Sequence, residues 1–152
     1  MAEFFNVLPP ALALAELFKH LPASARPENI PTVDALDRVT AEPVRSPAAL
    51  PAFPRSTMDG YAVRAQDTFG ASATLPAYLN VIGEVPMGNA PTLTLNMGQA
   101  ALVHTGGMIP NGADAVVMIE HTQTTRENEI EVVKAAAVGE NVLRVGEDVE
   151  SG

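Results

Sequence analysis

The fold is decided within Pro51-Ala52-Phe53-Pro54-Arg55-Ser56-Thr57-Met58-Asp59-Gly60-Tyr61-Ala62, where proline-rich sequence gives way to glycine-containing sequence. Nine of the 13 prolines lie at or before Pro54, whereas all 11 glycines lie at or after Gly60. Proline lacks an amide donor and restricts φ, so the prolines between Pro43 and Pro54 predict a stiff, extended connector. The part of the chain that follows is expected to contain short strands joined by turns.

Before the connector, apolar residues recur at near-helical spacing behind Pro9-Pro10, at Leu12, Leu14, Leu17, Phe18 and Leu21. This pattern predicts a helix over residues 10–21 that ends at Pro22. A shorter helical period covers residues 32–37, and residues 39–44 are expected to be extended.

After the connector, apolar β-forming runs alternate with Gly, Pro, Asn and Asp turns, which predicts strands. The expected strands cover residues 75–81, 100–104, 115–119 and 130–133. Residues 138–141 predict a turn, and the alternation over 143–150 predicts an edge strand. The predicted fold class is therefore mainly β with a short amino-terminal helix, and we expect the chain to be part of a longer protein.

Composition excludes several function classes. The formal net charge of -9 argues against a nucleic-acid-binding or anionic-membrane-binding surface. The absence of cysteine excludes disulfides, thiol nucleophiles and thiolate metal sites, and it fits a cytoplasmic protein. No apolar run approaches the roughly 18 residues that a membrane span needs.

Three segments could carry chemistry. In the first, the stiff connector presents Asp59 beside Gly60, although Asp-Gly is also an ordinary turn dipeptide. In the second, Thr105-Gly106-Gly107 could offer successive backbone amides to an anion. The alternative for this segment is a wide surface loop that contains a tight turn at Asn111-Gly112.

The third segment places Glu147, Asp148 and Glu150 beside Arg144, a density of carboxylates that suits Mg²⁺. The alternative is a solvated acidic edge that discourages strand pairing. His104 and His121 lack the spacing of a helical zinc site, so each is interpreted as a strand-end residue with a hydrogen-bonded ring.

These motifs occur in an order that resembles the MoeA/gephyrin E-domain family of molybdopterin molybdenumtransferases. The resemblance rests on Ser56-Thr57-Met58-Asp59-Gly60-Tyr61-Ala62-Val63, Thr105-Gly106-Gly107 with Pro110 to Val117, and Gly139-Glu140-Asn141-Val142 with Gly146-Glu147-Asp148. It implies an enzyme that inserts molybdenum from molybdate into adenylylated molybdopterin with Mg²⁺ present. It also implies a homodimer, and an upstream adenylating enzyme as a possible partner.

The resemblance also implies a set of site residues. Asp59, Thr105 and Asp148 match catalytic positions, with Asp59 and Asp148 as candidate metal ligands, and Ser56, Gly106 and Arg144 are candidates for substrate binding. Only Arg144 is basic where some members carry a run of arginines.

The family's architecture implies a β-rich, lid-like second domain over residues 51–137, inserted into an elongated first domain formed by residues 1–50 and 138–152. The large third domain would be absent from this chain. A dimerisation or scaffolding module without catalytic residues is the alternative function.

Overall fold

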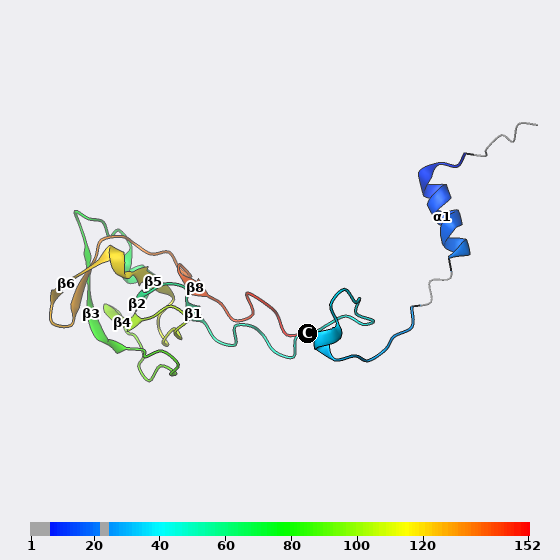
Figure 1. The fold of residues 1–152 in the computed structure, drawn as a ribbon. Helices are drawn as coiled ribbons and strands as arrows, with labels where there is room; N and C mark the ends of the chain where they lie inside the picture. The colour runs from blue at the N-terminus through cyan, green and yellow to red at the C-terminus, as the bar shows by residue number, and fades with distance from the viewer. Residues whose placement is uncertain (1–6, 22–24) are drawn as a thin grey trace, which may run out of the picture. The chain divides into compact units, whose positions relative to one another are not determined.

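The structure is a computed structural model that describes residues 7–21 and 25–152 (Figure 1). The chain divides into two compact units, one that ends at Val44 and one that spans Arg45–Gly152. The division into first and second domains that the family resemblance implies stays a prediction.

In the first unit, helix α1 spans Pro10–His20, which confirms the predicted helix to within one residue. Pro22, which was expected to end it, lies outside the described residues. A 3-10 helix, η1, covers Thr32–Asp34 and is shorter than expected. A separate turn follows at residues 36 and 37, where Asp37 has a φ of 63°. Residues 39–44, which were expected to be extended, contain a bend at residues 41 and 42 and belong to no strand.

In the second unit, a curled six-stranded sheet has the order β5-β2-β4-β3-β7-β6. Strands β3 and β4 run parallel, whereas the other neighbours in the sheet are antiparallel. The strands are β2 (Gly60–Val63), β3 (Ala77–Glu84), β4 (Gln99–Val103), β5 (Ala115–Met118), β6 (Thr122–Arg126) and β7 (Glu129–Val132), with 3-10 helices η2 (Ala65–Thr68) and η3 (Ile119–His121) between them. The sheet confirms the fold class and the four expected strands.

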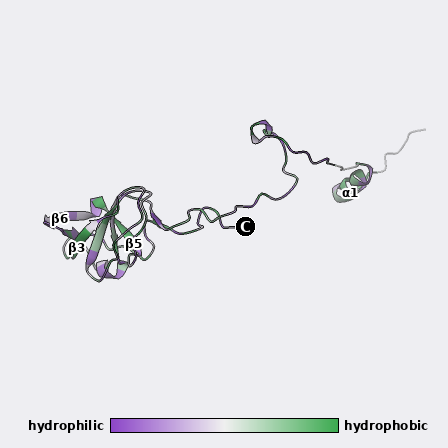
Figure 2. Cartoon of the chain, turned by 90° about the horizontal axis from the view of Figure 1, so that it is seen from below, coloured by the Kyte–Doolittle hydropathy of each residue, from purple (hydrophilic) through white to green (hydrophobic). Residues whose placement is uncertain are grey.

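Strand β2 lies inside the sheet and is buried on both faces. Val63 packs into one apolar cluster with Leu79 and Ile130, whereas its neighbour Ala62 packs into a second cluster with Val103. Figure 2 shows apolar segments in the strands of this unit. Burial on both faces fixes the position of β2, and therefore of the residues that precede it.

A narrow ribbon leads into the sheet. Strand β1 (Arg55–Ser56) pairs antiparallel with β8 (Val142–Leu143), and further along the ribbon Leu50 pairs with Val149. The edge strand predicted over 143–150 is wrong over most of its length, because a turn with Gly146 at φ 76° interrupts the pairing.

Candidate functional site

Asp59 lies in the short bend between β1 and β2 and is exposed. Gly60, the first residue of β2, passes so close to β5 that a Cβ added to it would lie 2.0 Å from the carbonyl oxygen of Val117. The backbone amide of Ile119 also donates to the carbonyl oxygen of Asp59 at 3.1 Å. The glycine is therefore required by close approach, and this packing holds the carboxylate at the start of a buried strand.

Thr105 lies in a tight turn that follows β4. The amide of Gly107 donates to the carbonyl of His104 at 2.8 Å, and Gly106 has the positive φ, 82°, that a type II turn requires at its third residue. Two backbone hydrogen bonds join the turn to Ser56. The Gly106 amide donates to the Ser56 carbonyl at 2.7 Å, and the Ser56 amide donates to the Gly107 carbonyl at 2.9 Å. Two segments far apart in the sequence are thus joined.

This arrangement brings Asp59 and Thr105 together. The Thr105 amide donates to Asp59 Oδ1 at 2.8 Å, and the Thr105 hydroxyl donates to the same oxygen at 3.1 Å. These two donors, first the amide and then the hydroxyl, hold the pKa of Asp59 below its ordinary value, and nearby His104 adds a smaller lowering effect. Asp59 is therefore an exposed, ionised carboxylate near neutral pH, oriented through one oxygen.

The anion-binding hypothesis for Thr105-Gly106-Gly107 is wrong. The three successive amides donate to Asp59 Oδ1, to the carbonyl of Ser56 and to the carbonyl of His104. None of them is left to bind an anion. The alternative interpretation, a surface loop with a tight turn at Asn111-Gly112, agrees better with the structure. The Ala113 amide donates to the Pro110 carbonyl and closes a turn in which Gly112 has a φ of 87°.

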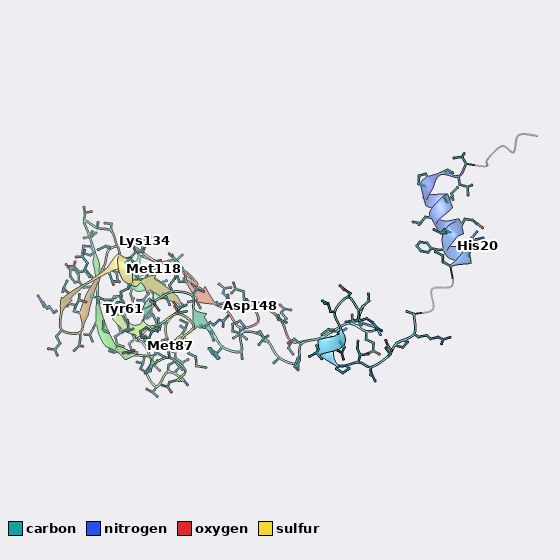
Figure 3. All side chains as sticks on the ribbon, in the orientation of Figure 1. His20, Tyr61, Met87, Met118, Lys134 and Asp148 are labelled. Carbon is teal, nitrogen blue, oxygen red and sulfur yellow. The ribbon has the colours of Figure 1, made fainter. Side chains whose placement is uncertain are left out.

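Asp148 is held by a different contact. Its carboxylate lies 3.3 Å from the guanidinium of Arg55 on β1, and its amide donates to the Leu50 carbonyl. Figure 3 shows Asp148 on the ribbon, outside the sheet that contains Tyr61. Asp148 is therefore linked to β1, the strand that precedes Asp59. Among the described residues, no hydrogen bond connects the carboxylates of Asp148 and Asp59.

The candidate substrate-binding residues differ in how they are placed. Ser56 is only 1% exposed, and its hydroxyl is used within the bend, where it accepts from the Met58 amide at 3.2 Å. Gly106 is exposed at the tip of the turn. Arg144 is exposed at an open depression of about 400 Å³, where Glu147 and Glu150 also line the wall. Direct contact of these residues with a substrate stays a prediction.

Magnesium binding by Asp59 or Asp148 stays a prediction. Among the residues that the structure describes, no three His, Asp or Glu side chains come together as metal ligands. The two candidate ligands are also occupied, Asp59 Oδ1 by Thr105 and Asp148 by the cation of Arg55.

Two further polar side chains support the site. Asp114 Oδ1 accepts from the buried amide of Ala65 at 2.6 Å, which fixes the segment that follows β2. The ring of His104 hydrogen-bonds Glu84 at 2.8 Å, which confirms the expected strand-end role for this histidine. Both contacts span tens of residues in sequence, so no local pattern could have revealed either partner.

No helix in the described part of the chain is long and apolar enough to cross a membrane.

Comparison with known proteins places this site in a family context. Residues 8–152 match the family described as MoeA N-terminal region (domain I and II). A Mycobacterium tuberculosis (strain CDC 1551 / Oshkosh) protein named molybdopterin molybdenumtransferase 2 is 39% identical over 129 residues, which cover 85% of this chain and 32% of that protein. A Bacillus subtilis (strain 168) protein named molybdopterin molybdenumtransferase is 38% identical over 136 residues, which cover 88% of this chain and 32% of that protein.

A solved structure agrees with these matches. The crystal structure of the molybdopterin biosynthesis moeA protein from Pyrococcus horikoshii OT3 superimposes with a TM-score of 0.84 at 38% sequence identity. The superposition covers 97% of this chain and 38% of that chain. The chain thus spans about a third of the length of the curated relatives that it matches.

Proposed function

Since the chain belongs to the MoeA family, whose N-terminal region it matches, we propose that it forms part of a molybdopterin molybdenumtransferase. The proposed reaction inserts molybdenum from molybdate into adenylylated molybdopterin. The names of the relatives support this class of substrate. We also propose a cytoplasmic location and a homodimer, both as the family resemblance implies.

The single observation that carries a catalytic role is the contact between Asp59 and Thr105. Two donors from one residue converge on Oδ1 of an exposed carboxylate at 2.8 and 3.1 Å. Such preorganisation keeps the carboxylate ionised and oriented before a ligand arrives. We therefore assign to Asp59 the binding or orientation of a substrate group that carries a hydrogen-bond donor.

The same contact suggests a role for Thr105. Its amide and hydroxyl both donate to Asp59, so the hydroxyl is already used when no substrate is present. Thr105 accordingly orients Asp59 and is not the donor to substrate. Asp148 and Arg55 would act as a charged pair on the ribbon beside this bend.

The charge of the chain limits what it does by itself. Molybdate and the pterin phosphate are anions, and a formal charge of -9 repels them. We propose that most of the affinity comes from parts of the protein outside these residues. Mg²⁺ is part of this proposal only because the resemblance implies it, and no step is assigned to it.

The affinity proposal is tested by titrating the 152-residue chain with molybdopterin in a calorimeter. We expect no micromolar binding and no turnover. Micromolar binding by the chain alone would overturn the proposal that its affinity lies elsewhere.

The catalytic proposal is tested in the complete protein with Asp59→Asn and Asp148→Asn, and with Asp34→Asn as a control on an exposed 3-10 helix. Asp59→Asn is expected to lower molybdenum insertion by roughly 100-fold, the effect of losing one preorganised polar group. The control should retain the original rate. Full activity of Asp59→Asn and Asp148→Asn in an intact dimer would favour the alternative, a dimerisation or scaffolding module.

One observation favours an interaction role in addition. Helix α1 has no buried residue, and its apolar side chains Leu12, Leu17 and Phe18 are each more than half exposed. Exposed apolar side chains along one helix make α1 a candidate interaction surface. Light scattering on the chain and on a Leu17→Glu variant tests whether α1 supports the proposed homodimer: loss of a dimer in the variant would support this role, and an unchanged dimer would refute it.

A further inference from the structure

Glu84 and His104 form a side-chain pair at the edge of the sheet that carries the Thr105 turn. Strands β3 and β4 are parallel, so their carboxyl ends lie at the same edge. Glu84 is the last residue of β3, and His104 directly follows β4. Their side chains meet at 2.8 Å, between His104 Nε2 and Glu84 Oε1.

His104 is also the first residue of the turn that holds Thr105. Its carbonyl accepts the amide of Gly107 and so closes the turn. Fixing the ring of His104 to β3 therefore fixes the residue from which the Thr105 backbone extends. The Thr105 amide must point at Asp59 Oδ1 from this position.

The segment after Glu84 contacts the other side of the same turn. The terminal methyl of Met87 lies 3.9 Å from the position that a Cβ would take on Gly106, the residue after Thr105. Figure 3 shows Met87 in the sheet-containing unit. The end of β3 thus contacts the turn at His104, and Met87, which follows β3, lies near its other side.

We propose that the Glu84–His104 pair is a positioning device that holds Thr105 in register with Asp59. The pair needs no contact with substrate, since it acts through the turn. For its effect on turnover the proposal rests on the proposed function, but the geometric claim stands by itself.

The pair can be removed without disturbing the core, because the side chains of His104 and Glu84 are 37% and 49% exposed. The variants are His104→Leu and Glu84→Met in the 152-residue chain, since methionine has a similar length and no oxygen to accept from His104. The readout is amide hydrogen exchange, measured by NMR at Thr105 and in the surrounding strands. An exposed pair of this kind contributes little to global stability, so the amides of β2 and β4 should exchange as before.

At Thr105 the expected result is local. Exchange of its amide should accelerate by about twofold to fivefold in both variants, as follows from the energy range of an exposed ion pair. The double variant should exchange no faster than either single variant, because both remove one contact. His104→Gln keeps a donor in a similar place and should restore slow exchange.

His121→Leu is the matched control, since His121 lies on the sheet-containing unit beside Lys134 rather than Glu84. Thr105 exchange that is the same in His104→Leu, Glu84→Met and His121→Leu would overturn the proposal. Should His104→Leu fail to fold, Glu84→Met, which has a similar length but no acceptor for His104, gives the same decision.

A second measurement uses the complete protein. His104→Leu should lower kcat for molybdenum insertion and leave KM for adenylylated molybdopterin within about twofold, because a positioning residue acts on the bound state. A raised KM with unchanged kcat would contradict positioning. If Asp59→Asn leaves turnover intact while Thr105 exchange still depends on His104, the proposed function fails and the positioning geometry stands.

Discussion

Gly60→Ala tests the claim that β2 and β5 lock Asp59 in place. The new Cβ would lie 2.0 Å from the Val117 carbonyl oxygen, whereas real Cβ contacts essentially never fall below 3.0 Å. The two strands must therefore separate by about 1 Å, as expected of an overpacked core. Overpacking of this kind costs about 1–3 kcal/mol, and a weakened ladder hydrogen bond adds about 1 kcal/mol.

We accordingly expect the free energy of unfolding to fall by roughly 2–4 kcal/mol, a large part of the stability of a small domain. The assay is urea unfolding followed by circular dichroism, with the slope of the transition compared between variants. Strand separation would also disturb the contact between the Ile119 amide and the Asp59 carbonyl, so the Thr105 and Asp59 resonances should shift.

Gly88→Ala is the matched control. Gly88 has a φ of 77° and no atom within 4 Å of an added Cβ, so its substitution incurs only backbone strain of about 1–2 kcal/mol. A Gly60→Ala variant that is no less stable than Gly88→Ala would refute the close-packing explanation.

Three further variants test individual contacts. The two Thr105 donors lower the pKa of Asp59, so the carboxylate stabilises the fold above its unfolded pKa of about 3.9, and this stabilisation is lost as the pH falls through the lower folded pKa. Thr105→Val removes one of these donors and should raise the pKa of Asp59, measured by NMR. An unchanged pKa would contradict this. Asp114→Ala leaves the buried Ala65 amide without its acceptor and should cost about 1–3 kcal/mol in urea unfolding, whereas a neutral result would show that water replaces the carboxylate. Thr68→Val removes a buried hydroxyl that bonds two backbone groups and should cost about 2 kcal/mol or more by the same assay; a loss below about 0.5 kcal/mol would contradict this.

The sequence predicted the elements whose residues carry a strong local pattern. Leucines at near-helical spacing predicted helix α1, and apolar runs between turn residues predicted β3, β4, β5 and β7. Strand β6 was missed because Thr122–Arg126 is polar throughout and lies at the edge of the sheet. Strand β2 was given no bounds of its own, since small Ala62 is buried on one face and Val63 on the other, which removes the alternation of a half-buried strand.

The candidate site was predicted in part. Asp59 and Thr105 were both selected from their motifs, but a hydrogen bond across 46 residues leaves no trace in local spacing. The prediction that this turn offers free amides to an anion was wrong for the same reason. Two of the acceptors, Asp59 Oδ1 and the Ser56 carbonyl, belong to a segment far away in the sequence. Asp148 was expected beside a metal, yet the fold places it against Arg55.

The role of Thr105 is tested most directly by comparing Thr105→Val with Thr105→Ser in the complete protein. Valine removes only the hydroxyl that donates to Asp59, whereas serine keeps it. The measured quantity is the rate of molybdenum insertion into adenylylated molybdopterin. We predict that Thr105→Ser stays within about twofold of the original rate and that Thr105→Val falls by roughly tenfold or more. Equal rates for the two variants would contradict the claim that Thr105 orients a working Asp59.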